Sequence, residues 1–450
     1  MKKYTFYFLG IGGIGMSALA NYLFCCGHNV SGSDLVSNAQ TKRLQSLGVK
    51  VVTGNNKDNL DTSADYLVYT QAIDPADPEL IYAKELGIKI ISREKLLGRI
   101  FRTFTNRIAV SGAHGKTTTC GLLYQALSAN LVSPTAFIGG EISGLGNFIM
   151  GKPDYCIAEA CEYKGSFLTL SSTISVILNV DLEHLDYYKE LKDIERAFNK
   201  FACKTCQGGV VVTNGDAVPY YITNNCLAKN ITYGFNKNNN FFATNITQKN
   251  AKYSFDCYKN GDFYAHINLL LRGRHNIYNA LATLCVCDSL GLDKVCTVKG
   301  IESFLGAQRR WQIITNSFTN IVEDYAHHPS EVRSLVETAL QLGYDKIILA
   351  FQPHTYTRTS KLFLDFVSCF VGVDYLIMLP IYPAREQPIV GVTSKHLADT
   401  IADTGLTNAI YCQDFESAGR LIATLASKED LVLVVGAGDI FKLSSLLQAF

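Results

Sequence analysis

The stretch Arg107–Thr119, RIAVSGAHGKTTT, determines the fold expected for this chain of 450 residues. The apolar run Arg107–Val110 predicts a buried strand. A glycine turn, Ser111–Gly115, follows the strand, and a helix is expected to begin at Lys116. Backbone N–H groups and the N-terminus of that helix would then face an anion. The stretch therefore predicts a strand, loop and helix of a parallel α/β sheet, with phosphate as the ligand.

Side chains in this loop have the chemistry that a nucleotide triphosphate requires. Lys116 can neutralise a β- or γ-phosphate, and the hydroxyl of Thr117 can bind Mg²⁺. The spacing departs from the eight-residue phosphate loop, because Val110 occupies the position of the first glycine. A chance glycine turn before a helix is the alternative. Phosphate binding is favoured, and its candidate residues are Gly112, Ala113, His114, Gly115, Lys116, Thr117 and Thr118.

Two polar residues that follow later strands are candidates for a metal site. Glu159 ends the apolar strand Tyr155–Ala158, and His184 lies just beyond the strand Ile174–Leu178. In parallel α/β sheets, ligands collect at the carboxyl ends of strands, so both side chains are expected near the phosphate loop. Mg²⁺ prefers oxygen ligands, which makes the histidine the less natural partner. A capping glutamate and a structural histidine are the alternatives.

A second glycine-rich turn lies near the N-terminus. The segment Gly10–Gly15, GIGGIG, separates an expected strand, Tyr4–Leu9, from an expected helix, Met16–Cys26. It matches the GxGxxG fingerprint of dinucleotide-binding folds, and Asp34 lies at the right distance downstream. Alone, this pattern indicates an oxidoreductase, but the same geometry would hold the diphosphate of a UDP-sugar. The separate phosphate loop makes a plain dehydrogenase the weaker interpretation.

Polar clusters further along the chain are also site candidates. The segment Arg272–Asn276, RGRHN, precedes a helix that contains Asn279, and the pair of arginines in Arg309–Trp311 suits phosphate. The segment Asp324–Pro329, DYAHHP, is expected to begin a helix, and Phe351–Thr359 starts at a strand end. The alternatives are a solvated basic turn at a domain junction, a helix-capping aspartate and surface histidines.

Composition excludes several function classes. The length suggests two to four domains, and 48% hydrophobic with 18% charged residues is an ordinary globular balance. A net charge of +1 gives no strong field for nucleic acid or an acidic membrane. No apolar run is long enough to span a bilayer, and glycines in the first apolar run argue against a signal peptide.

The 14 cysteines are typical of buried thiols in the cytoplasm rather than of a disulfide framework. One CxxC pair, Cys203–Cys206, is present, but the sequence offers no further zinc ligands at the required spacing.

Six motifs occur in the order found in the Mur ligases, the family that builds the peptide of bacterial cell-wall precursors. The motifs are GIGGIGMSALA at Gly10–Ala20, GAHGKTTT at Gly112–Thr119, NVDLEHLDYY at Asn179–Tyr188, RGRHNIYNAL at Arg272–Leu281, DYAHHPSEV at Asp324–Val332 and FQPHTYTRT at Phe351–Thr359. The resemblance spans essentially the whole chain. The first motif and the last two are most similar to the member of the family that adds L-alanine.

The resemblance implies three α/β domains in chain order. Residues 1–105 would form a Rossmann-like domain that binds the UDP-sugar. Residues 106–307 would form a central ATPase domain of the P-loop type with a parallel sheet. Residues 308–450 would form a Rossmann-like domain that binds the amino acid.

The resemblance also implies functional residues by matching position. Besides the phosphate loop, those expected around ATP are Asn276, Asn279, Arg310 and Asp324. Those expected at Mg²⁺ are Thr117, Glu159 and His184. Those expected around the amino acid and the transferred phosphate are Tyr325, His327 and Arg358. Those expected at the UDP-sugar are Gly12, Gly13, Ile14, Gly15, Ser33 and Asp34. The expected catalytic residues are Lys116, His184, His327 and Arg358.

The implied activity is ATP-dependent ligation of L-alanine to UDP-N-acetylmuramate, through an acyl phosphate, during peptidoglycan synthesis. ATP and Mg²⁺ would be the cofactors of a cytoplasmic monomer or homodimer. A related ligase that adds a cell-wall peptide to the same sugar is the alternative, and the sequence does not decide among Ala, Gly and Ser. Three departures from the family pattern affect substrate details: Ala113 for Thr, Cys161–Lys164 for DESD, and Thr355 for Arg.

Overall fold

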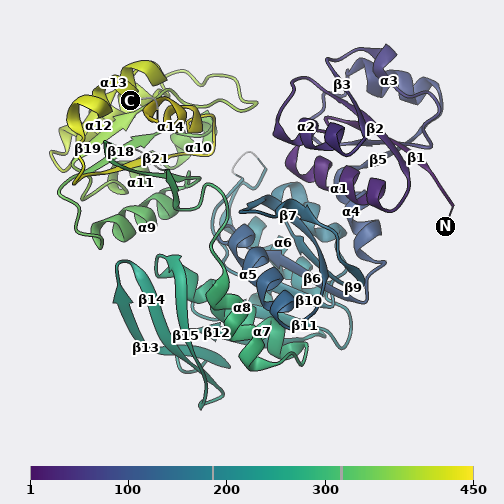
Figure 1. Cartoon of the computed structure of the whole chain (residues 1–450), viewed down its shortest axis with the longest axis horizontal. Coiled ribbons are helices and arrows are strands. Elements are labelled where there is room, and N and C mark those ends of the chain that lie inside the picture. Colours follow the sequence, from purple (N-terminus) through teal and green to yellow (C-terminus); the bar gives the residue numbers. More distant parts are fainter. Residues whose placement is uncertain (1, 185–186, 315–317, 449–450) are drawn as a thin grey trace.

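The computed structural model describes residues 2–184, 187–314 and 318–448. Leu185 and Asp186, within the motif at Asn179–Tyr188, therefore lie outside the described residues. The chain forms three bodies, each built on its own β-sheet. The N-terminal and C-terminal bodies lie at the upper right and upper left, and the central body lies below and between them (Figure 1). The prediction of three α/β domains is confirmed.

The N-terminal sheet is parallel throughout, in the order β3-β2-β1-β4-β5. Its strands are β1 (Thr5–Leu9), β2 (Asn29–Asp34), β3 (Lys50–Thr53), β4 (Tyr66–Tyr69) and β5 (Lys89–Ser92). Its helices are α1 (Ile14–Cys25), α2 (Ala39–Ser46), α3 (Pro78–Glu85), α4 (Arg93–Phe101) and the 3₁₀ helix η1 (Lys57–Asn59). Helix α1 begins two residues earlier than expected, so Ile14 and Gly15 belong to its first turn. The strand order reverses beside β1, and the glycine turn follows β1 at this switch point.

The central sheet has the order β15-β14-β13-β12-β11-β10-β6-β9-β7-β8. Its first strands are β6 (Asn106–Ser111), β7 (Pro134–Ile142), β8 (Gly146–Ile149), β9 (Lys152–Glu159) and β10 (Ile174–Ile177). The others are β11 (Val210–Asn214), β12 (Lys229–Gly234), β13 (Phe241–Lys249), β14 (Lys252–Lys259) and β15 (Asp262–Arg272). The helices are α5 (Lys116–Ala129), α6 (Leu191–Cys203), α7 (His275–Ser289), α8 (Lys294–Ser303) and the 3₁₀ helices η2 (Tyr163–Thr169) and η3 (Tyr220–Ile222).

The parallel sheet predicted for the central domain is present in its middle, and the sheet is mixed because β8, β14 and β15 at its two edges run antiparallel to their neighbours. Two-residue loops, Asn250–Ala251 and Asn260–Gly261, join β13 to β14 and β14 to β15. All four loop residues have positive φ, as the favoured hairpin turns require. Strands joined by so short a loop must be antiparallel. These strands extend at the lower left of Figure 1.

The C-terminal sheet has the order β16-β17-β21-β18-β19-β20, with only β16 antiparallel. Its strands are β16 (Gln312–Ile314), β17 (Asn320–Asp324), β18 (Ile347–Phe351), β19 (Tyr375–Met378), β20 (Asn408–Tyr411) and β21 (Leu431–Val435). Its helices are α9 (Pro329–Leu340), α10 (Tyr356–Lys361), α11 (Phe363–Ser368), α12 (Ser394–Asp403), α13 (Phe415–Leu425) and α14 (Phe441–Leu447).

The helix expected at the segment Asp324–Pro329 begins only at its last residue. Asp324 ends β17, and α9 begins at Pro329. His328 caps the helix, because its ring accepts a hydrogen bond from the backbone N–H of Ser330 while Glu331 reaches back to the N–H of His328. A proline in the first helical position lacks only an N–H that would be unpaired there.

Apolar side chains cover both faces of the parallel strands, as expected when helices pack on each side of a sheet. In the central body, α5, α7 and α8 contribute buried side chains to the same core as β6, β9 and β10. The core places the loop between β6 and α5 on a rigid layer. No helix among the described residues is both long and apolar enough to cross a membrane.

Close packing of α8 on α5 generates a stability prediction. A Cβ atom on Gly300 would lie 2.6 Å from Cα of Ala126 and 2.7 Å from the carbonyl of Gln125, both backbone atoms of α5. Gly300→Ala should therefore lower the free energy of unfolding by about 1–3 kcal/mol, although alanine is the better helix former. Thermal unfolding measures the change. Lys299→Ala, at an exposed position of the same helix, is the control, and an equal midpoint for both variants would contradict the packing argument.

Candidate active site

The phosphate loop joins β6 to α5, and a buried carboxylate holds its lysine. The Nζ atom of Lys116 lies 3.1 Å from Oε2 of Glu162 and donates to the carbonyls of Gly112 and Ala113. The side chain of Glu162 is only 2% exposed. Burial disfavours the charged lysine, but the neighbouring acidic groups, Glu162 foremost and Glu159 among them, together outweigh burial and raise the pKa of Lys116. The loop therefore contains a permanent cation.

Residues from two other elements fix the shape of this loop. Asn179, just after β10, accepts a hydrogen bond from the backbone N–H of His114 at 2.9 Å and donates to its carbonyl at 3.1 Å. Gly115 has φ of 86°, and a Cβ atom there would lie 2.7 Å from Oδ1 of Asn279 in α7. Only glycine fits so close an approach in this conformation. The ends of β6, β10 and α7 thus meet at one loop.

Oxygen donors suitable for Mg²⁺ lie at the first turn of α5. The hydroxyl of Thr117 donates to Oε2 of Glu159 at 2.9 Å, and the same oxygen accepts the N–H of Gly139. Glu159 ends β9, the strand next to β6. A hydroxyl and a carboxylate are the hard oxygen ligands that Mg²⁺ takes, so the two residues fit this ion.

His184 was expected near Thr117 and Glu159, but it is connected to the phosphate loop through Glu162. Its Nε2 atom lies 3.5 Å from Oε1 of Glu162, the carboxylate that holds Lys116. Burial favours the neutral imidazole, but hydrogen bonds to Cys161 and Glu162 raise the pKa of His184 to about 10. The structure thus brings Thr117 and Glu159 into direct contact and places His184 against Glu162.

The C-terminal body contacts the phosphate loop through α9. The imidazole of His114 lies 3.2 Å from Oε1 of Glu331 and 3.2 Å from Oγ of Ser330, both in α9. On its other side the ring lies 3.3 Å from Asp181, which follows β10. Burial favours the neutral ring, but Glu331 and Asp181 outweigh it and raise the pKa of His114 to about 10. A protonated histidine therefore links the two bodies.

Residues expected around the nucleotide lie next to this contact. Asn279 donates to Oδ1 of Asn276 at 2.9 Å, and both side chains are buried in the first turns of α7. The guanidinium of Arg310 lies 3.5 Å from Glu331. Asp324 accepts the backbone N–H of Trp311 at 2.7 Å, so it braces the segment that carries Arg310. The structure therefore gathers these residues between the central and C-terminal bodies.

The residues expected at the amino acid form a second cluster across the same boundary. Nη2 of Arg358 lies 2.9 Å from Oε2 of Glu183 in the central body, and Nη1 donates to the carbonyl of His354. The rings of Tyr325 and His327 are in edge contact, with centroids 5.4 Å apart. Burial lowers the pKa of His327 to about 4, so its ring is neutral near pH 7. The cluster thus holds a buried cation and a neutral imidazole.

In the N-terminal body, the glycine turn is braced by the acidic residue that the fingerprint places downstream. The N–H of Gly12 donates to Oδ2 of Asp34 at 2.8 Å, and Asn38 donates to the carbonyl of Gly12 at 3.2 Å. Ser33 is buried, and its hydroxyl donates to Glu79 at 2.7 Å. The structure therefore directs the Ser33 side chain toward Glu79 of α3, and the residues Gly12–Gly15 lie at the end of β1 and in the first turn of α1.

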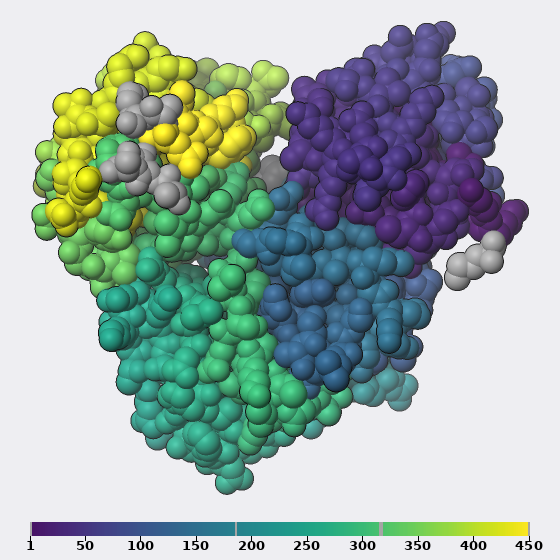
Figure 2. Space-filling view, in the orientation of Figure 1, coloured from purple at the N-terminus to yellow at the C-terminus, as the bar shows by residue number. Residues whose placement is uncertain are grey.

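The N-terminal and central bodies are joined by side-chain hydrogen bonds. Asn147 of the central body donates to the carbonyl of Ile14 at 2.7 Å, and Gln40 donates to Glu141 at 2.7 Å across the same boundary. The space-filling view shows a recess between the N-terminal and C-terminal bodies, above the central one (Figure 2). The glycine turn of the N-terminal body therefore lies at the boundary with the central body, which carries the phosphate loop.

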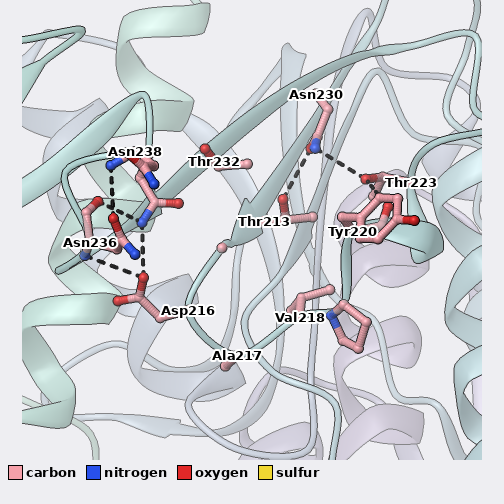
Figure 3. Close-up of a pocket in the computed structure, with 13 residues that line it drawn as sticks. Thr213, Asp216, Ala217, Val218, Tyr220, Thr223, Asn230, Thr232, Asn236 and Asn238 are labelled. Carbon is pink, nitrogen blue, oxygen red and sulfur yellow. Dashed lines mark hydrogen bonds between the residues drawn. The ribbon is translucent and has the colours of Figure 1, made fainter.

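A separate polar pocket of about 560 Å³ lies at the ends of β11 and β12 (Figure 3). On one side, Asp216 accepts hydrogen bonds from Asn236 and Asn239. On the other, Asn230 connects Thr213 with Thr223. None of the residues predicted for the site lines this pocket. The sequence did not predict this pocket. The side chains of Asp216, Asn239, Asn230, Thr213 and Thr223 that line it form hydrogen bonds with neighbouring residues of the same pocket.

Sequence reasoning missed the acidic partners of the predicted cations. Glu162 holds Lys116, Glu183 holds Arg358, and Glu331 contacts His114 and Arg310. The motifs at Asn179–Tyr188 and Asp324–Val332 contain Glu183 and Glu331, and Glu162 lies in the stretch Cys161–Lys164 that departs from the family pattern. The sequence shows that these residues are acidic, but it does not identify the cation that each one contacts.

Family models match the chain in three successive parts. The matches are "Mur ligase family, catalytic domain" at residues 5–105, "Mur ligase middle domain" at 110–287 and "Mur ligase, glutamate ligase domain" at 309–438. Among similar proteins, the UDP-N-acetylmuramate–L-alanine ligase of Agathobacter rectalis is 39% identical, over 98% of this chain and 97% of its own. That of Caldanaerobacter subterraneus is 41% identical, over 97% and 95%.

Solved structures agree with these matches. The UDP-N-acetylmuramate–alanine ligase of Thermotoga maritima has a TM-score of 0.83 and 28% identity, over 99% of this chain and 98% of its own. A murein peptide ligase of Psychrobacter arcticus has a TM-score of 0.76 over 99% and 98%. Its identity is only 19%, so this second likeness concerns the fold alone.

The protonated His114 generates a pH prediction. Its pKa is raised to about 10 from an ordinary value of 6.5, so its contribution to stability is complete below pH 6.5 and is lost as the pH rises toward 10. His114→Gln should lower the thermal midpoint most near pH 6, by an amount equivalent to about 1–3 kcal/mol, and least near pH 10. The control is His396→Gln, at an exposed position of α12. An effect of His114→Gln that is the same at pH 6 and pH 10 would contradict the assignment.

Proposed function

The chain belongs to the Mur ligase family, and we propose that it joins L-alanine to the carboxylate of UDP-N-acetylmuramate with ATP as the energy source. The observation that carries this function is 39% identity, over 98% of the chain, to a protein of that activity. The reaction yields ADP and phosphate and belongs to peptidoglycan synthesis. The names of these relatives specify both the sugar nucleotide and L-alanine, which favours this function over the addition of a whole peptide.

Three domains divide the work in this proposal. Residues 1–105 bind the UDP-sugar, 106–307 bind ATP, and 308–450 bind the amino acid. At the sugar nucleotide, backbone groups of Gly12–Gly15 face the diphosphate, with Asp34 as the brace that accepts the N–H of Gly12. All 14 cysteines are free thiols, which favours action in the cytoplasm, as a monomer or homodimer.

The chemistry begins with activation of a carboxylate, which is a poor electrophile. The carboxylate oxygen of UDP-N-acetylmuramate attacks the γ-phosphorus of ATP, ADP leaves, and an acyl phosphate forms. Lys116, held between Glu162 and the loop carbonyls, offsets the negative charge on the transferred group. When bound at Thr117 and Glu159, with His184 on the neighbouring strand end, Mg²⁺ supplies further charge neutralisation.

Amide formation completes the reaction. The amino group of L-alanine attacks the acyl carbon, phosphate leaves, and the nitrogen loses a proton. His327 is neutral near pH 7, because burial lowers its pKa to about 4, and it therefore has a nitrogen free to accept that proton. Arg358, which lies beside His327 in the same cluster, binds the alanine carboxylate or the phosphate that it approaches. Contacts of α9 with the phosphate loop exclude water from the acyl phosphate.

Release of ADP tests the proposed function directly. Purified protein is incubated with ATP, Mg²⁺ and UDP-N-acetylmuramate, and L-alanine, glycine, L-serine or a cell-wall peptide is added in turn. L-Alanine should give the highest kcat/KM, with one ADP for each amide formed. Higher kcat/KM with the peptide would instead identify the peptide-adding ligase, and no ADP release with any acceptor would refute both.

Removal of Lys116 should separate catalysis from stability. Lys116→Ala should abolish ligation, and it should also lower stability by about 3–5 kcal/mol because the buried Glu162 loses its partner. The double variant Lys116→Ala/Glu162→Gln should recover most of the thermal midpoint but none of the activity. Ligation by the double variant at the wild-type rate would show that Lys116 does not act on ATP.

Replacement of Arg358 tests the amino-acid end. Lysine keeps the charge of Arg358 but loses the planar fork that binds two oxygens. Arg358→Lys should raise KM for L-alanine or lower kcat by roughly ten- to hundredfold, while ATP binding to the free protein stays near normal. Arg333→Lys, at an exposed position of α9, is the matched control. Unchanged kinetic constants in Arg358→Lys would place this residue outside the site.

A further inference from the structure

Cys161, Glu162 and His184 gather a thiol, a carboxylate and an imidazole at one place beside the phosphate loop. One ligand atom from each residue lies within 4.8 Å of those from the other two. Cys161 and Glu162 follow β9, and His184 follows β10, so the two strands that flank β6 bring them together. Glu162 is buried, and the other two are half-buried, so the group is both pre-formed and accessible.

The mixture of donors indicates the kind of ion. Sulfur and nitrogen ligands suit Zn²⁺ and other thiophilic cations, whereas Mg²⁺ takes oxygen ligands almost exclusively. Zn²⁺ sites with three protein ligands keep a fourth position for water. We propose that Cys161, Glu162 and His184 form a binding site for a thiophilic divalent cation, with Zn²⁺ as its type. The site shares His184 with the residues expected at Mg²⁺ but does not include the oxygen donors Thr117 and Glu159.

Binding there changes the partners of the surrounding groups. When the ion binds, Sγ of Cys161 gives up its proton to solvent and becomes a thiolate. If the His184 ring is protonated, the nitrogen that binds the ion also gives up its proton to solvent. Nζ of Lys116, now 3.1 Å from Glu162, loses that carboxylate to the cation and faces a like charge. Because Lys116 and His184 belong to the proposed nucleotide site, occupancy by Zn²⁺ inhibits ligation. Only this consequence rests on the proposed function.

Other candidates for the same ion are weaker. Among the described residues, one further group of ligating side chains has comparable geometry, and it consists of His114, Asp181 and His328. That group contains no thiol, and His114 is occupied by contacts with α9. The CxxC pair Cys203 and Cys206 belongs to neither group, and Cys206 instead receives a hydrogen bond from Arg107 at 3.1 Å.

Titration with Co²⁺ tests the proposal without any assay of ligation. Co²⁺ replaces Zn²⁺ in such sites and gives a thiolate-to-metal charge-transfer band when cysteine is a ligand. The full-length chain and the control Cys203→Ser/Cys206→Ser should both show the band, and Zn²⁺ should abolish it. Cys161→Ser and Cys161→Ala should both lack it, with thermal unfolding used to verify that each is folded. A band that persists in folded Cys161→Ser, or disappears in the control, overturns the assignment.

Calorimetry and kinetics complete the experiment. Zn²⁺ affinity measured with excess Mg²⁺ should fall roughly tenfold or more in Cys161→Ser, the scale on which metal sites respond even to loss of an outer partner. Ligation should be inhibited by Zn²⁺ in the wild type and in the Cys203→Ser/Cys206→Ser control, and inhibition should be at least tenfold weaker in Cys161→Ser. Equal Zn²⁺ affinity in wild type and Cys161→Ser refutes the site. Loss of ligase activity in every variant would bear on the proposed function alone, since the spectra still decide metal binding.

Discussion

A buried ion pair between Lys116 and Glu162 is the constraint on which the proposed active site depends. Both groups are largely removed from water, and neither charge is tolerable there without the other. The pair fixes the lysine against the carbonyls of its own loop, and through Glu162 it connects the loop to His184. The Glu162 carboxylate thus connects the segments that follow β9, β6 and β10. These three strands are neighbours, and their carboxyl ends form a single edge of the sheet.

Charge also organises the boundary between the central and C-terminal bodies. Glu183 of the central body pairs with Arg358, and His114 is placed between Asp181 and Glu331. Glu183 and Glu331 are largely buried, so their contacts with Arg358 and His114 depend little on salt screening compared with surface pairs. They hold the cluster of Tyr325, His327 and Arg358 beside the phosphate loop. The proposed reaction requires this arrangement, because phosphoryl transfer from ATP to a carboxylate is followed by acyl transfer to an amine.

Much of the fold was predictable, because the relevant signals are local. The strands expected at Tyr4–Leu9 and Arg107–Val110 correspond to β1 and β6 within one residue at each end, and α5 begins at Lys116 as expected. The antiparallel edge was missed although its signal was present, since Asn260–Gly261 is a favoured hairpin turn. The alternative of a helix-capping aspartate at Asp324 is wrong, because Asp324 ends a strand and His328 caps α9.

By itself the sequence determined the three α/β domains, the two glycine-rich turns and the residue types suited to ATP, because each depends on side chains that are adjacent along the chain. Only the tertiary structure decided which carboxylate meets which cation. Glu162 reaches Lys116 because β9 lies next to β6, and Glu183 reaches Arg358 because the C-terminal body docks on the central one. Strand order and docking arise from packing between segments far apart in the sequence, so no local pattern specifies them.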